Sequence, residues 1–283
     1  METAKLHDLA LKDLVRARYG GIAAGTQSAH AAPANACCGE GADSTLDSKA
    51  REMGYTAAEV ASVPEGANLG LGCGNPQAIA ALKPAEIVLD LGSGAGFDCL
   101  LAASAVGPEG RVIGVDMTHE MLAKARANAA RIGARNVEFR LGEIEHLPVA
   151  DAIADVIISN CVVNLVPDKA QVFREAYRAL KPGGRLAISD VVNVAPLPED
   201  LRADPALLCG CVAGAVPAER VETLLRAAGF TDIAITVKPN SREMIADWAP
   251  GRGIENCVAA AIIEARKPRE GGAPTPAPRA CCG

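Results

Sequence analysis

Short apolar runs alternate along the middle of the chain with longer segments in which apolar residues recur every three or four positions. The runs predict strands at 87–91, 111–115, 137–141, 155–159 and 185–190, and the longer segments predict helices at about 97–106, 118–132 and 168–180. Strands and helices that alternate in this way form a parallel sheet with helices on both faces. The pattern therefore predicts an α/β core that begins near Glu86.

Less regular hydrophobic patterns lie before and after this core in the sequence. Residues 1 to about 20 have helical spacing, about 22–45 has the composition of a loop, and a short helix is expected after the loop at 69–76. After Asp190, a helix at 217–228 and weak strands near 231–237 and 258–265 would bring the sheet to seven strands, the last two as an antiparallel pair. We expect four segments: an N-terminal extension of helix and loops (1–84), the core (85–192), a smaller C-terminal α+β part (193–266) and a disordered Pro-rich tail (267–283).

A glycine-rich turn follows the first predicted strand. Gly92, Gly94 and Gly96 have the spacing G-x-G-x-G, and Asp116 ends the second strand. Glycines let the backbone turn sharply and approach a ligand, and a carboxylate at the next strand end can accept hydrogen bonds from both ribose hydroxyls. Dinucleotide sites use G-x-G-x-x-G instead. The pattern predicts a nucleoside-cofactor site, and the turn resembles the first motif of class I methyltransferases that use S-adenosylmethionine.

Charge and composition narrow the class of partner. The chain has 28 basic and 34 acidic residues, a net charge of −6, without a long run of one sign. A nucleic acid backbone or an anionic membrane is therefore not expected as a partner. No apolar segment reaches the roughly 18 residues of a membrane span, and the first residues are charged where a signal peptide would be apolar. We expect a cytoplasmic protein that acts on a small molecule.

The ten cysteines are many for such a protein, and in a reducing compartment they indicate metal binding or catalysis rather than disulfides. The chain has no C-x-x-C motif and only four histidines, so a zinc ribbon or finger is poorly supported. Cys161 directly follows the strand predicted at 155–159 and should face the same crevice as the glycine turn. The alternative is that Cys161 is a buried thiol that only packs.

Several separate motifs surround four of the cysteines. They are Asn35-Ala36-Cys37, Gly72-Cys73-Gly74, Ser159-Asn160-Cys161-Val162, Asn164-Leu165-Val166-Pro167-Asp168-Lys169, and Gly214-Ala215 after Cys211. Together with Asp90-Leu91-Gly92-Ser93-Gly94 and Asp116-Met117-Thr118, they resemble the arsenite S-adenosylmethionine methyltransferases over roughly residues 12–265.

This resemblance implies a Rossmann-like class I methyltransferase fold and the methylation of trivalent arsenic to mono-, di- or trimethylated products. It implies that arsenic is bound and reduced by the thiols of Cys37, Cys73, Cys161 and Cys211. It implies cofactor contacts by Gly92, Ser93, Gly94, Asp116, Met117, Ile144, Glu145 and Asn160. It also implies that arsenite and methylated arsenic thiol conjugates are substrates, and that thioredoxin or glutathione is the external reductant.

The chemistry of arsenic agrees with this site. Trivalent arsenic is soft, so thiolates select it, and its lone pair can attack a methyl group without a general base. The absence of an obvious catalytic histidine fits, and we expect His119 and His146 at the surface. Cys209 is an extra thiol that could replace Cys211, whereas we expect Cys99 and Cys257 to be packing residues. Two other hypotheses remain: a methyltransferase for a small organic acceptor, and a thiol-rich metalloid-binding protein without turnover.

Overall fold

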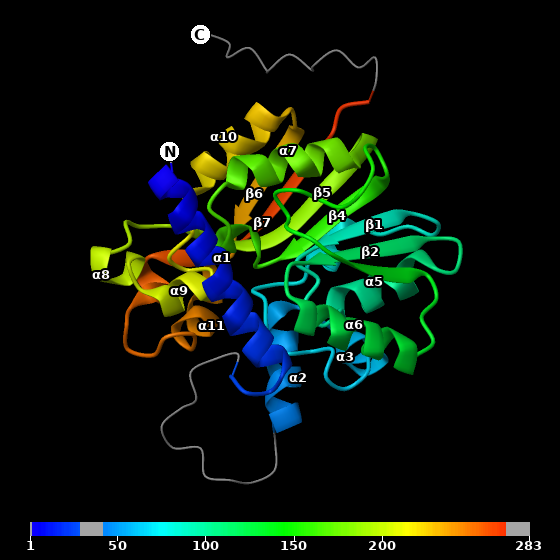
Figure 1. Ribbon diagram of the computed structural model, residues 1–283, viewed down its shortest axis with the longest axis horizontal. Coiled ribbons are helices and arrows are strands. Elements are labelled where there is room, and N and C mark those ends of the chain that lie inside the picture. The colour runs from blue at the N-terminus through cyan, green and yellow to red at the C-terminus, as the bar shows by residue number, and fades with distance from the viewer. Residues whose placement is uncertain (1, 29–41, 270–283) are drawn as a thin grey trace, which may run out of the picture.

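The computed structural model describes residues 2–28 and 42–269, and its centre is a seven-stranded sheet covered by helices on both faces (Figure 1). The strands are β1 (Ile87–Leu91), β2 (Arg111–Asp116), β3 (Val137–Leu141), β4 (Ala154–Asn160), β5 (Leu180–Asn193), β6 (Thr231–Val237) and β7 (Val258–Arg266). Their order is β3-β2-β1-β4-β5-β7-β6, and only β7 runs antiparallel to its neighbours. The predicted seven-stranded, mostly parallel Rossmann-like fold is confirmed.

Two apolar layers hold the sheet between its helices. Along β1, Leu89 and Leu91 pack in the cluster that contains α7 (Lys169–Ala179) and α10 (Ala218–Ala228). Val88 points the other way and packs with α5 (Phe97–Val106) and α6 (His119–Arg131). Successive side chains of a strand alternate between faces, so a strand covered on both faces is apolar along most of its length, as β1 is apart from Asp90. The core strands were therefore recognisable in the sequence as continuous apolar runs.

The helices outside the core were predicted less well. The remaining ones are α1 (Glu2–Ala23), α2 (Ala42–Met53), α3 (Ala57–Ser62), α4 (Pro76–Ala80), α8 (Glu199–Arg202), α9 (Pro205–Cys209) and α11 (Arg242–Ala246), with 3-10 turns at η1 (Val163–Leu165), η2 (Pro239–Ser241) and η3 (Ile254–Asn256). The short helix after the loop at 69–76 is confirmed as α4. The loop predicted at about 22–45 is wrong at both ends, because 22–23 belong to α1 and 42–45 to α2. Residues 29–41 lie outside the described part.

The sequence predicted that the first helix ends at about residue 20, but α1 continues through Gly20 and Gly21 to Ala23. A Cβ atom on Gly20 would lie 3.2 Å from the carboxylate of Glu120 in α6. The glycine therefore lets α1 and α6 approach each other closely, and these two helices pack together along the front of the molecule in Figure 1. Within residues 2–28 and 42–269, no helix combines the length and the apolar character that crossing a bilayer requires.

Candidate functional site

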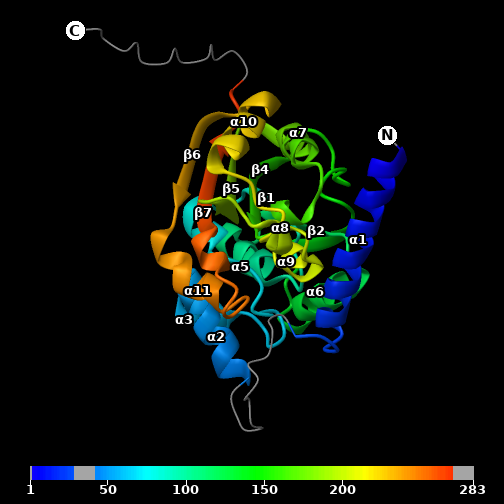
Figure 2. The same ribbon diagram turned by 90° about the vertical axis from the view of Figure 1, so that its left-hand side faces the viewer.

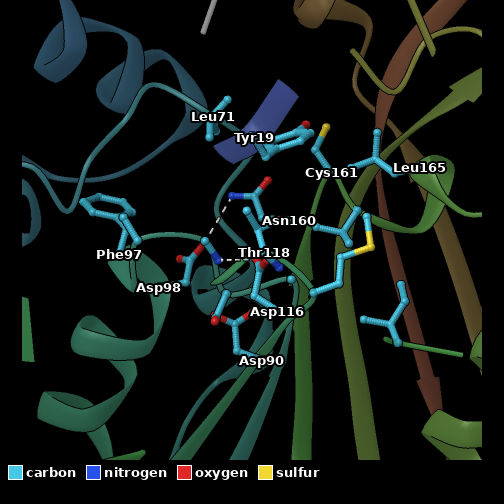
Figure 3. Close-up of a pocket in the computed structure, with 18 of the residues that line it drawn as sticks. Tyr19, Leu71, Asp90, Phe97, Asp98, Asp116, Thr118, Asn160, Cys161 and Leu165 are labelled. Carbon is cyan, nitrogen blue, oxygen red and sulfur yellow. Dashed lines mark hydrogen bonds between the residues drawn. The ribbon is translucent and has the colours of Figure 1, made fainter. Parts of the chain in front are cut away.

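A pocket lies at the carboxyl ends of β1, β2 and β4, beneath α1 (Figure 3). Ligands of open α/β sheets bind at this edge. All the residues expected to contact the cofactor line this one pocket: Gly92, Ser93, Gly94, Asp116, Met117, Ile144, Glu145 and Asn160. Val15 and Tyr19 of α1 and Cys161 line it as well. We call it the cofactor pocket.

The glycine turn is tied to the end of β2. The N–H groups of Gly92 and Ser93 both donate to the carbonyl of Val115, at 2.8 and 3.0 Å. Gly92 has φ +74°, and a Cβ atom there would lie 2.4 Å from a methyl group of Val162. Both the backbone conformation and the space therefore require glycine at this position.

Asp116 is held at the same edge by backbone donors. The N–H of Gly94 donates to Oδ2 of Asp116 at 2.9 Å, and the N–H of Thr118 donates to Oδ1 at 2.8 Å. Each carboxylate oxygen can accept a second hydrogen bond. The carboxylate is thus fixed at the pocket wall, where it could receive two hydroxyl groups of a ribose.

The cofactor pocket is acidic. Four carboxylates line it, those of Asp90, Asp98, Asp116 and Glu145, and no Lys, Arg or His appears among the described residues that line it. Burial raises the pKa of Asp90, of Asp98 and of Asp116, and the mutual repulsion of Asp90 and Asp98 adds to the shift of Asp90. The buried carboxylates of Asp90, Asp98 and Asp116 make a pocket that favours a positively charged ligand.

Asp98 and Tyr55 were not among the residues predicted from the sequence. Asp98 lies in the first turn of α5, and the hydroxyl of Tyr55 donates to its Oδ1 at 2.7 Å. An acidic residue just after a glycine turn, at a helix N-terminus, is a signal that the sequence contained. Tyr55 offered none, because it lies outside any motif and reaches the site only through the fold.

A second pocket lies on the other side of Cys161, and we call it the thiol pocket. Cys161, Cys209 and Cys211 line it, together with the apolar side chains of Leu207 and Trp248. Cys161 also lines the cofactor pocket, as do Tyr19, Leu71 and Gly72. Figure 3 shows the Cys161 sulfur beside Tyr19, at the top of the cofactor pocket. The two pockets therefore meet at Cys161.

Three of the four predicted arsenic-binding cysteines come together. The sulfur atoms of Cys73 and Cys161 and a carboxylate oxygen of Asp190 lie within 4.8 Å of one another, and all three residues are buried. The Cys211 thiol donates to the carbonyl oxygen of Cys161 at 2.7 Å. Cys37 lies outside the described residues. The structure thus brings Cys73, Cys161 and Cys211 into one cluster and adds Asp190, which the sequence analysis did not single out.

Two thiols of this cluster, those of Cys161 and Cys211, have a raised pKa. Burial raises the pKa of Cys161 well above its usual value, and hydrogen bonding with Cys211 and Cys73 raises it further. Hydrogen bonding to Cys161 lowers the pKa of Cys211, but burial and the nearby Asp190 raise it by more. A raised pKa favours the protonated thiol over the thiolate, and a thiophilic ligand that bound at these sulfur atoms would replace the thiol protons.

Backbone strain marks the same two cysteines. Cys161 has φ +58° and Cys211 has φ +65°, which is the left-handed region. A residue with a Cβ pays about 1–2 kcal/mol for that conformation. Ala81, Ala85, Ala152 and Asp232 also have a positive φ, so this conformation alone does not assign a function to the two cysteines.

The remaining expectations concern residues outside this cluster. Cys99 and Cys257 are buried in apolar clusters, as expected of packing residues, and Cys99 also donates to the carboxylate of Asp90 at 3.1 Å. His119 and His146 are exposed, as expected. Cys209 lines the thiol pocket, and its backbone carbonyl accepts a hydrogen bond from the Tyr19 hydroxyl at 3.1 Å.

Ion pairs hold α1 over the cofactor pocket. Lys12 lies 2.6 Å from Glu143 and 3.0 Å from Glu145, and Arg16 lies 2.5 Å from Glu143. The Lys12 and Glu145 side chains are 13% and 5% exposed, whereas Arg16 is 36% exposed. Lys12 therefore neutralises Glu145, one of the four carboxylates that line the cofactor pocket.

Replacing Lys12 by methionine should loosen this attachment. Lys12→Met leaves Glu145 without its cation, and we expect the free energy of unfolding to fall by about 2 kcal/mol, together with weaker cofactor binding. Arg16→Met is the matched control, because Arg16 is more exposed and pairs with Glu143 and the exposed Asp13 but not with Glu145, and its replacement should cost less than about 1 kcal/mol. Urea denaturation of both variants measures the difference. Equal losses would show that Glu145 does not depend on Lys12.

Comparisons with known proteins agree on the family. The model of a family described as "Methyltransferase domain" matches residues 82–229. An arsenite methyltransferase from Halobacterium salinarum is 55% identical over 268 residues, which cover 91% of this chain and 66% of that protein. An arsenite methyltransferase from Aquipseudomonas alcaligenes is 53% identical over 152 residues, 51% of this chain and 44% of that protein. The chain thus spans just under two thirds of the first relative and less than half of the second.

Among solved structures, an arsenic(III) S-adenosylmethionine methyltransferase from Chlamydomonas reinhardtii is similar in both fold and sequence. It superposes with a TM-score of 0.57 at 34% identity and covers 79% of this chain and 73% of its own. The matched family model spans the strands that form the cofactor pocket.

Proposed function

This chain belongs to the methyltransferase-domain family, and we propose that it transfers the methyl group of S-adenosylmethionine to trivalent arsenic. The observation that carries the proposal is the position of Cys161, which lies in both the cofactor pocket and the thiol pocket. A thiol at that junction would hold an arsenic atom next to the group that donates the methyl. The arsenite methyltransferases to which the chain is similar support the same reaction.

The chemistry of the cofactor pocket fits S-adenosylmethionine. This cofactor supplies a methyl group on a positively charged sulfonium, and it also carries an ammonium group. The carboxylates of Asp90, Asp98 and Asp116 line the pocket, and Asp116 is oriented to accept the ribose hydroxyls. The Ser93 hydroxyl is buried there without a hydrogen-bond partner in the described part of the chain. A bound polar ligand would satisfy such a group.

The proposed acceptor is an arsenic atom bound by Cys73, Cys161 and Cys211. Arsenite, As(OH)₃, exchanges its three hydroxyl groups for three sulfur atoms and releases three molecules of water, each formed from a hydroxyl group and a thiol proton. The bound arsenic keeps one lone pair, which attacks the methyl carbon in line with the sulfonium sulfur. Alignment of this kind contributes roughly 7–11 kcal/mol in well-oriented reactions. Cys37, outside the described residues, remains a proposed further thiol by resemblance alone.

Each methyl transfer oxidises arsenic by two electrons, so the next round needs a reductant. We propose that an external dithiol or thiol, such as thioredoxin or glutathione, supplies these electrons. The six cysteines described by the structure are all free thiols, which supports a reducing compartment such as the cytoplasm. In this proposal residues 85–192 bind the cofactor, and residues 1–84 and 193–266 contribute the other thiols and cover the site.

Product analysis tests the proposed function directly. The full chain is incubated with arsenite, S-adenosylmethionine and glutathione, and the arsenic species are separated by chromatography with detection by mass spectrometry. We expect methylated arsenic and one molecule of S-adenosylhomocysteine for each methyl group transferred. If the protein binds the cofactor but leaves arsenite unmethylated, the acceptor is wrong, and a small organic molecule takes its place.

A further inference from the structure

The side chain of Asn160 forms two hydrogen bonds with the backbone of the loop that carries Cys73. Its Oδ1 accepts a hydrogen bond from the Cys73 N–H at 3.0 Å, and its Nδ2 donates to the Gly74 carbonyl at 2.7 Å. At Gly72, with φ +119°, a Cβ atom would lie 2.8 Å from the same amide group. Asn160 also directly precedes Cys161 in the chain. The orientation of this one amide therefore sets the position of the Cys73 thiol relative to Cys161.

Two other residues fix the orientation of the Asn160 amide. Its Nδ2 donates to the Tyr55 hydroxyl at 3.1 Å and lies 3.4 Å from Oδ2 of Asp98, while the Tyr55 hydroxyl donates to Oδ1 of Asp98 at 2.7 Å. A flipped amide would point its oxygen at the Asp98 carboxylate and its nitrogen at the Cys73 N–H, which loses bonds on both sides. Figure 3 shows Asp98 and Asn160 joined at the centre of the pocket.

The hydrogen bonds among Tyr55, Asp98 and Asn160 extend to the wall of the cofactor pocket. Asp98 and Phe97 both line the cofactor pocket, and the Tyr55 ring packs edge-on against Phe97 at 4.8 Å between centroids. Gln77 donates to the backbone carbonyl of Asp98 at 2.8 Å and holds its position. A cationic ligand in the pocket stabilises the ionised Asp98 carboxylate. An ionised acceptor strengthens the hydrogen bond from Tyr55, because charge-assisted bonds are shorter and stronger.

We propose that Tyr55 and Asp98 are positioning residues that couple cofactor binding to arsenic binding through Asn160 and the Cys73 loop. The inference rests on the proposed function, since it assigns one pocket to the cofactor and the cysteine cluster to arsenic. Cofactor in the pocket holds Asp98, Tyr55 and Asn160 in the arrangement that places Cys73 beside Cys161. By linkage, arsenic bound to that cluster tightens cofactor binding by the same factor.

The coupling is measured as a ratio of dissociation constants. Arsenite binding is followed by the fluorescence of Trp248, the single tryptophan of the chain, which lines the thiol pocket. The full-length protein is titrated with arsenite alone and with saturating sinefungin, an analogue with an ammonium group in place of the sulfonium methyl group, which cannot transfer a methyl group. In the unaltered protein we expect sinefungin to tighten arsenite binding by about 10-fold.

Tyr55→Phe removes only the hydroxyl that links Asp98 to Asn160. We expect the ratio of the arsenite dissociation constants without and with sinefungin to fall to about 2-fold or less. The affinity for arsenite alone should change little, because the three thiols remain. Asp98→Asn keeps the shape but removes the charge, and it should lower the ratio in the same way. Tyr177→Phe is the matched control, since Tyr177 packs on Phe230 at 5.3 Å, away from both pockets, and should keep the full ratio.

The outcomes separate this inference from the proposed function. A full ratio in both Tyr55→Phe and Asp98→Asn, or a ratio of one in the unaltered protein that binds both ligands, overturns the coupling and leaves the proposed function standing. Failure of the unaltered protein to bind arsenite or sinefungin overturns both. Thermal unfolding of each variant identifies a general loss of structure, in which case the Tyr55→Phe result is replaced by that of Asp98→Asn.

Discussion

Cys161→Ser is expected to lower the rate of arsenic methylation by on the order of 10³-fold or more while leaving the affinity for S-adenosylmethionine unchanged. The substitution replaces a soft sulfur by a hard oxygen at the junction of the two pockets, and a hydroxyl does not hold trivalent arsenic at neutral pH. Without that bond, the arsenic lone pair is no longer aligned with the methyl carbon. Single-turnover rates and calorimetric titration of the cofactor measure the two quantities separately.

The matched control is Cys257→Ser. Cys257 is also a buried free thiol in the same apolar cluster as Cys161, but it does not line the cofactor pocket or the thiol pocket. Its replacement should lower stability by about 1–3 kcal/mol, the cost of an unpaired buried hydroxyl, and leave the rate of methylation near that of the unaltered protein. Turnover retained in Cys161→Ser would show that this thiol only packs, and the proposed arsenic site would have to be abandoned.

The strands of the core could be read from the sequence because burial on both faces requires continuous apolar runs. The seven predicted strands agree with β1 to β7, although β5 begins at Leu180, five residues before its predicted start. The short helices were harder to predict from the sequence. α3 begins at a capping box made by Thr56 and Glu59, a signal that was present but overlooked, whereas α8 and α11 are each one turn long and too short for a periodic pattern.

The two halves of the candidate site differ in how far the sequence predicted them. The glycine turn and Asp116 follow consecutive strands, so topology alone places them at one edge of the sheet. The convergence of Cys73 and Cys161 has no such basis, because Cys73 lies in an irregular loop held by Asn160. Only the family resemblance predicted that these thiols would meet. Neither route predicted Asp190, whose carboxylate joins the cluster from the interior of β5.

Asp190 was missed because its role depends on hydrogen bonds that form only in the folded chain. Its carboxylate accepts hydrogen bonds from the N–H groups of Val163 and Val191 and from the side chain of Asn164, which fixes the segment that follows Cys161. Burial raises the pKa of Asp190 to about 6, despite these donors. The same residue thus organises the backbone around Cys161 and places a carboxyl group beside the thiols.

Asp116→Ala is expected to weaken S-adenosylmethionine binding by about 100-fold, which corresponds to roughly 2.7 kcal/mol. The carboxylate is proposed to accept two ribose hydroxyls, and each hydrogen bond to a charged group contributes about 1.5–3 kcal/mol. The substitution also removes the acceptor for the N–H groups of Gly94 and Thr118, which loosens the turn. Calorimetric titration with S-adenosylhomocysteine measures the affinity, and Trp248 fluorescence should still report arsenite binding, because the thiols are unchanged.

Asp155→Ala provides the control for a general loss of structure. Asp155, in β4, accepts a backbone hydrogen bond from Ile87 at 2.9 Å and pairs with Lys181 at 2.8 Å, but it does not line the cofactor pocket. Both variants therefore remove a carboxylate that a backbone N–H requires, and both should lower the free energy of unfolding. Only Asp116→Ala should reduce cofactor affinity. If the two variants bind cofactor equally well, the ribose does not lie at the end of β2, and the orientation of the cofactor between the glycine turn and Cys161 must be reversed.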